Sequence, residues 1–268
     1  MNTKTLERRF SVERVGLLLR NRIYEEAPVI GIGAAVIFAL NLLTLWGSHQ
    51  PMLNAPRLHG VAWIAVIVIG GLLLAGGAFK GMHDGKAGTD WILLPATPLE
   101  KYVAALADSA VVYPIAASAV CAAMSALLAL LARLFGVDGG ELWLPLDSRI
   151  LLDWADYAIA TSVLLAGSAS FRKIPLLKTI GVGSAFFLVM IGLIALGVRA
   201  FFGPDGGAAT HMSYMNGSFN FDGSKVSQRA QDVVRMLFDI ARYAILPAFA
   251  ILFGVAKVIE KEGRDEVQ

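Results

Sequence analysis

Charged residues are scarce in this chain. Asp, Glu, Lys and Arg make up 16% of its 268 residues, whereas 56% are hydrophobic. A soluble globular domain carries roughly 25% charged residues, and the mean hydropathy here is +0.64. The composition therefore excludes an ordinary soluble protein and predicts a protein embedded in a lipid bilayer. The net charge is only +2, so the sequence does not indicate nucleic acid as a partner.

Residues suited to covalent chemistry are also few. The single cysteine, Cys121, cannot form a disulfide within the chain. The four histidines all fall in segments expected to be loops: His49, His59, His83 and His211. Intramembrane serine or metal chemistry would need a histidine within a span, so we predict neither an enzyme nor a metal site.

A nucleotide-binding loop of the form GxxxxGK[ST] is missing as well. Such a loop cradles phosphate with its backbone amides and neutralises it with its lysine. The nearest segment, "GMHDGKA" from Gly81, has the wrong spacing. We therefore expect no ATP hydrolysis by this chain and no cofactor in it.

The chain does contain six apolar runs of roughly the 20 residues that a helix needs to cross a bilayer. They predict an all-α integral membrane protein with six transmembrane helices, near residues 28–46, 61–79, 102–131, 154–171, 179–198 and 233–256. Pro114 and Pro247 are expected to kink their helices. Glycines that recur in the second and fifth runs predict close helix packing.

The Lys and Arg residues between these runs indicate the orientation, because cytoplasmic loops retain positive charge. The N-terminal segment, the second and fourth loops and the C-terminal tail hold fifteen Lys and Arg residues, and the alternating loops hold five. Both termini are therefore expected in the cytoplasm. The first 27 residues lack an apolar core followed by a small-residue cleavage site, so we expect no cleavable signal.

The ends of the chain differ in character from the apolar runs. Residues 1–27 hold an imperfect amphipathic pattern that predicts a helix lying at the cytoplasmic interface; the alternative is a plain lead-in to the first span, with Pro28 in the first turn of that span. The six-span domain is expected over 28–258, followed by a cytoplasmic tail, 259–268. The segment near 199–232 is expected to be an irregular Gly/Ser/Asn-rich loop with room for a small hairpin.

The loop "DWILLPATPLEK", residues 90–101, interrupts the apolar pattern. Thr97 stands three residues before Glu100 with Pro98 between them, which predicts a capping box and the start of the third spanning helix. Pro95 ends a short apolar helix before it. Such a rigid helix could receive force from a soluble partner, or it could simply return the chain to the bilayer.

Several segments together resemble the ABC-2-type transporter permeases. "GKAGTDWILLPATPLEKYVAALADSAVVYPIA" is similar to the cytoplasmic loop and third span of that group, although Thr97 replaces the more usual serine. "RRFSVERVGLLLR", "LLAGSASFRKIPLLKT" and "VAKVIEKEGRDEVQ" resemble its N-terminal helix, its fourth-span loop and its charged tail.

The resemblance implies the membrane subunit of an ATP-driven exporter in a bacterial inner membrane. Two such permeases, as a homodimer or a heterodimer, would form the pathway, and separate ATPase subunits would bind ATP and magnesium. It also implies that the 80–101 loop and the N-terminal helix contact the ATPase. The docking residues expected by this resemblance are Asp90, Trp91, Leu94, Pro95, Glu100 and Lys101.

Ionisable residues within predicted spans are functional hypotheses, because they are costly in lipid. Asp108 lies about two turns into the third helix, and Asp239 and Arg242 are three residues apart on the sixth, close enough to pair. Such a pair is either structural or part of a translocation site. The alternatives to an ABC permease are an ion-coupled secondary transporter and a non-transporting membrane scaffold or regulator.

Overall fold

The computed structural model describes residues 10–47, 56–83, 88, 91, 93–134, 150–202, 211–215, 218–222, 236 and 239–265. Most of these residues are helical. The helical elements are α1 Val12–Gly47, α2 Pro56–Gly77, the 3-10 helix η2 Gly81–His83, α4 Pro98–Ala107, the π-helix η3 Asp108–Val112, α5 Tyr113–Leu134, α6 Ile150–Ser170, α7 Pro175–Phe202, the π-helix η4 Ala241–Ile245 and α9 Leu246–Asp265.

Within the described ranges, three helical stretches are long and apolar enough to cross a membrane: Ile64–His83, Pro98–Leu131 and Ala241–Gly263. They coincide with the second, third and sixth predicted spans, which supports the prediction of a helical membrane protein. The other three predicted spans fall on α1, α6 and α7.

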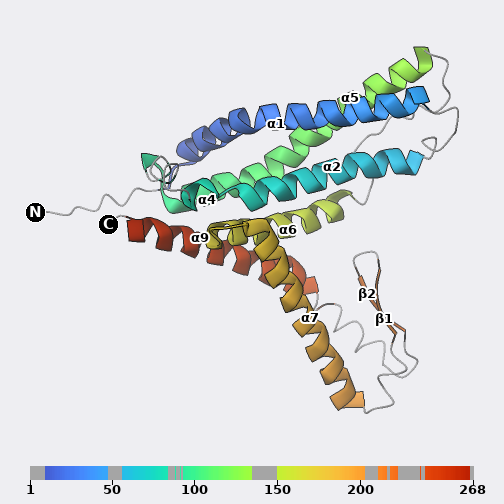
Figure 1. Cartoon of the computed structure of the whole chain (residues 1–268). Helices are drawn as coiled ribbons and strands as arrows, with labels where there is room; N and C mark the ends of the chain where they lie inside the picture. Colours follow the sequence, from blue (N-terminus) through green and yellow to red (C-terminus); the bar gives the residue numbers. More distant parts are fainter. Residues whose placement is uncertain are drawn as a thin grey trace, which may run out of the picture.

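The helices form an elongated bundle in which α6 packs against α2, α7 and α9, and α1 packs against α4 and α5. Figure 1 shows α1, α2, α5 and α6 running lengthwise, whereas α7 leaves the bundle at a steep angle. The starts of α1 and α4 and the end of α9 lie together at one end. We call this the terminal end.

The first helix differs from the prediction at one boundary. The sequence predicted an interfacial helix up to residue 27 and a separate span beginning at Pro28. The structure has one continuous helix, α1, with Pro28 inside it. A proline removes one backbone hydrogen bond, and long helices in membranes tolerate this because nearby groups compensate for the loss.

Two π-helical turns widen the helices just before prolines. Pro114 follows η3 by two residues, and Pro247 follows η4 by two residues. A proline has no N–H to donate to the preceding turn. At η3 the carbonyl oxygen of Ser109 instead accepts a hydrogen bond from the Tyr157 hydroxyl of α6, at 2.7 Å. The irregular turn η3 thus provides a hydrogen bond to α6.

Glycines allow close packing on one face of α2. A Cβ built on Gly71 would lie 1.8 Å from the Tyr157 hydroxyl, and one on Gly70 would lie 1.9 Å from the Tyr113 hydroxyl. The predicted packing role is therefore confirmed for these two residues. Gly77, by contrast, has no heavy atom of the described residues within 4 Å of a built Cβ.

The expected hairpin is present in the 199–232 segment. Strand β1, His211–Met215, pairs antiparallel with β2, Ser218–Asp222, and His211 lies opposite Asp222. In Figure 1 the hairpin lies away from the start of α1, at the opposite end of the protein.

Candidate functional site

The start of α4 is built as predicted from the "TPLEK" sequence. The Glu100 backbone N–H donates to Thr97 Oγ1 at 3.2 Å, and the Thr97 N–H donates to Glu100 Oε2 at 2.7 Å. Pro98 occupies the first turn. This reciprocal capping box satisfies two N–H groups that the helix cannot pair internally, so it holds α4 at a defined starting residue.

Glu100 also joins α4 to the start of α1. Its side chain is fully buried, and Arg14 Nη2 lies 2.7 Å from Oε1. The backbone N–H of Ser11 donates to the same oxygen at 2.7 Å. The hydrogen bond to Glu100 raises the pKa of the Arg14 guanidinium above its ordinary value. One carboxylate therefore connects two segments that are 86 residues apart.

Lys101 forms the next connection, from α4 to α9. It is 2% exposed, and its Nζ donates to Glu262 Oε1 and to the Trp91 carbonyl oxygen, both at 2.8 Å. The Nζ atom also lies 5.3 Å from the centre of the Trp91 ring. We call the contacts of Glu100 and Lys101 the terminal clamp, because they join α1, α4, α9 and the Trp91 segment.

Aromatic side chains anchor the Trp91 segment to the bundle. Trp91 packs edge-on against Phe79, and Phe79 stacks on Tyr102, with ring centres 5.5 and 5.6 Å apart. Ser168 Oγ of α6 accepts the Phe79 N–H at 2.9 Å. His83, expected in a loop, instead closes a candidate span and has its Nε2 3.2 Å from the Ser168 carbonyl oxygen. The segment is therefore held firmly at the terminal end.

The predicted docking residues divide into buried and accessible groups. Glu100 and Lys101 are buried, Trp91 and Leu94 are half-buried, and Pro95 is exposed. Asp90 lies outside the described residues.

Exposed apolar side chains occur beside the clamp contacts. Each lies within two residues of Ser11, Trp91 or Glu100. They are Phe10, Val12, Leu93 and Leu99, which are 49, 75, 73 and 43% exposed. We call these four residues the apolar terminal face. The sequence signals for them were the imperfect amphipathic pattern of residues 1–27 and the leucines of "DWILLPATPLEK".

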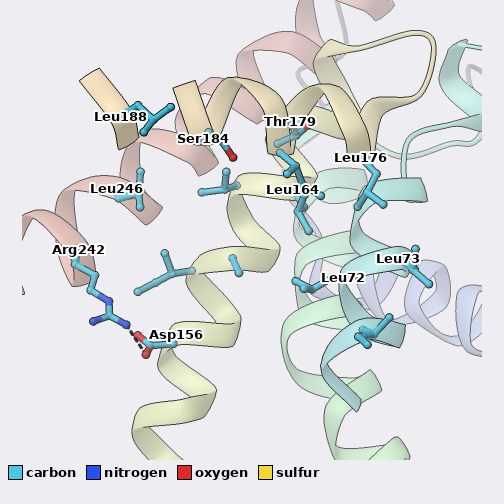
Figure 2. Close-up of a pocket in the computed structure, with 16 residues that line it drawn as sticks. Leu72, Leu73, Asp156, Leu164, Leu176, Thr179, Ser184, Leu188, Arg242 and Leu246 are labelled. Atoms are coloured by element: carbon cyan, nitrogen blue, oxygen red, sulfur yellow. Dashed lines mark ion pairs between the residues drawn. The ribbon is translucent and has the colours of Figure 1, made fainter. Parts of the chain in front are cut away.

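A second candidate site is a groove of about 790 Å³ between α2, α6, α7 and the η4–α9 helix. Figure 2 shows leucine side chains from several helices pointing into it and an ion pair at one edge. The pair joins Arg242 of η4 to Asp156 of α6, with 2.5 Å between Nη2 and Oδ2.

The ion pair leaves a polar group unsatisfied. The sequence predicted that Arg242 could pair with Asp239 on its own helix, and the structure shows that Arg242 pairs with Asp156 on another helix. The second carboxylate oxygen of Asp156, Oδ1, is buried and has no hydrogen-bond partner among the described residues. A buried acceptor in this state costs about 1–3 kcal/mol.

Asp108 lies in a third polar region, at the junction of η3 and α1. It is 2% exposed and faces Glu26 and Arg22 of α1. Arg22 Nη2 donates to the Ala78 carbonyl oxygen at 3.1 Å. Burial, followed by the charge of Asp108, raises the pKa of Glu26 to about 7. Asp239 is exposed on its helix.

In the described part of the chain, no three His, Cys, Asp or Glu side chains are grouped as a metal site would require. Comparison of the chain with protein-family models, with curated proteins and with solved structures finds no match.

Proposed function

We propose that the chain is the membrane-spanning permease subunit of an ATP-driven ABC exporter. It would have six transmembrane helices, with both termini in the cytoplasm of a bacterial cell and the spans in the inner membrane. The terminal clamp carries this proposal. It connects the two segments that the resemblance associates with ATPase contact, the N-terminal helix and the 80–101 loop, and it joins both to α9.

The clamp suggests how force from a partner would enter the bundle. α4, η3 and α5 form one continuous helical rod from Pro98 to Leu134. A push on the loop before Pro98 would therefore act along a whole span. Glu100 would transmit it to α1 and Lys101 to α9, because each forms charge-assisted hydrogen bonds to those helices.

The buried positions of Glu100 and Lys101 refine their expected role. We assign them to positioning the loop, and we assign direct contact with an ATPase to the apolar terminal face together with Pro95 and Asp90. Their exposure near the clamp makes these apolar side chains the candidates for a protein interaction site. The ATPase would supply ATP and magnesium, and a second permease, identical or different, would complete the pathway.

Co-purification tests this proposal. The tagged chain is isolated from its native host in mild detergent, and bound proteins are identified by mass spectrometry. We expect a nucleotide-binding ATPase with the wild type, and its loss with Leu93→Lys. The matched control is Leu177→Lys on α7, which adds the same charge at a similarly exposed leucine, 65% against 73%. If no ATPase is recovered where a known exporter retains its own, the proposal is wrong.

An ion-coupled transporter is the second candidate, and the buried carboxyl group of Asp108, inside the candidate span Pro98–Leu131, favours it. Ionisable residues within membrane helices often belong to proton relays. Transport that continues without ATP and stops when a proton gradient is abolished would support this candidate over the exporter.

A further inference from the structure

The walls of the groove are apolar along most of its length. One wall is formed by Ile69, Leu72 and Leu73. These residues belong to the candidate span Ile64–His83, so this wall is part of a candidate membrane-spanning helix. Leu164 of α6 and Leu188 of α7 face it from the other sides (Figure 2). The volume of about 790 Å³ falls within the roughly 300–1,000 Å³ of small-molecule sites. The groove can therefore hold an extended apolar chain.

One edge of the groove is polar. Asp156 and Arg242 pair there, and their charges cancel overall. The buried Oδ1 atom of Asp156 still needs a donor, which no described residue supplies. A carboxylate oxygen accepts hydrogen bonds and repels other anions. A ligand group that carries an N–H or O–H would thus donate the missing hydrogen bond to Asp156 Oδ1.

We propose that the groove binds an amphiphile that has an apolar chain and a hydrogen-bond-donating polar group, either a hydroxyl or a primary ammonium. The chain lies along the leucine-lined walls, and the polar group donates to Asp156 Oδ1. The inference rests on the proposed function only in identifying this amphiphile as the exported substrate. Binding itself requires no ATPase.

Photo-crosslinking in lipid nanodiscs tests the binding site. The purified chain is placed in phosphatidylcholine nanodiscs that contain a small amount of a lipid with a photoactivatable acyl chain. The probe is either phosphatidylethanolamine, whose ammonium has N–H donors, or phosphatidylcholine, whose ammonium has none. After irradiation, modified peptides are mapped by mass spectrometry. We expect several-fold more adduct from the phosphatidylethanolamine probe on the residues of α6 and α7 that line the groove.

A matched pair of glycine variants tests whether the chain occupies the groove. Gly183 lines the groove, and a Cβ built on it meets no described heavy atom within 4 Å. Gly183→Leu therefore has open space at its Cβ, and its side chain should occupy part of the groove and reduce the adduct several-fold. Gly181 has equally open surroundings and does not line the groove. Gly181→Leu should leave the adduct unchanged.

Asp156→Ala tests the polar contact. It should reduce labelling by the phosphatidylethanolamine probe about tenfold, corresponding to the loss of one hydrogen bond to a charged group, and leave the phosphatidylcholine signal unchanged. Asp153→Ala on the same helix is the control, because Asp153 is exposed and does not line the groove.

Equal labelling by the two probes, or labelling that Asp156→Ala does not change, would show that the groove holds bulk lipid only and would overturn the inference. Absence of groove adducts with both probes would overturn it as well. Because crosslinking uses the chain without a partner, these outcomes are independent of whether an ATPase co-purifies.

Discussion

Arg14 and Glu100 lie 86 residues apart in the sequence and form an ion pair with 2.7 Å between Nη2 and Oε1. The same carboxylate accepts the backbone N–H groups of Ser11 and Thr97. One side chain therefore caps the third predicted span and fixes the first helix against it. This relationship makes the loop before α4 a part of the rigid bundle at the terminal end.

Removal of the Glu100 carboxylate should destabilise the protein. Glu100→Ala removes the side-chain half of the capping box, the Arg14 ion pair and the acceptor of the half-buried Ser11 and Thr97 N–H groups, so we expect the free energy of unfolding to fall by about 2–4 kcal/mol. Thermal unfolding in detergent measures this change. Glu260→Ala is the control, because the ion pair of Glu260 with Lys257 is exposed, and its loss should change stability by less than about 0.5 kcal/mol. Equal effects of the two substitutions would contradict the structural role of the clamp.

Replacement of Lys101 should loosen the end of α9. Lys101→Met keeps the length of the side chain and removes the hydrogen bonds to Glu262 and to the Trp91 carbonyl oxygen. We expect faster amide hydrogen exchange in the last two turns of α9, measured by mass spectrometry. Lys257→Met, at an exposed ion pair on the same helix, should leave exchange at the wild-type rate. Unchanged exchange in the Lys101 variant would mean that the clamp does not hold α9.

Gly71 should not tolerate a side chain. The methyl group of Gly71→Ala would occupy the position of the Tyr157 hydroxyl and break its hydrogen bond to Ser109. Overpacking of this kind costs about 1–3 kcal/mol. Gly77→Ala, on the same helix with open space around the new methyl group, should be neutral or stabilising. Thermal unfolding of the two variants side by side checks the packing, and similar midpoints would contradict it.

Stability should depend on the protonation of Glu26. Its pKa is about 7 in the folded protein, against 4.5 as the ordinary value, so the folded state binds this proton more tightly than the unfolded state. The resulting contribution to stability is fully present below about pH 4.5 and is lost as the pH rises through about 7. The unfolding temperature should therefore fall over this range, and Glu26→Gln should flatten the slope. Glu25→Gln, the adjacent and exposed control, should retain it.

Local features were predictable because neighbouring residues determine them. Thr97, Pro98 and Glu100 specify a helix start through contacts within one turn, and the structure shows that start. The apolar runs predicted a helical membrane protein, since lipid requires every backbone group to be paired within a helix. The second, third and sixth runs coincide with helices long and apolar enough to span.

The partners of charged side chains were decided by the tertiary structure. In the structure Glu100 is buried against Arg14, and Arg242 pairs with Asp156 of another helix. These contacts join residues far apart in the chain, and no local pattern encodes which helices become neighbours. The sequence alone determined where apolar helices form and where α4 begins. Only helix packing decided which charges are buried, which leucines remain exposed, and where a groove opens, because burial depends on surfaces brought together from distant segments.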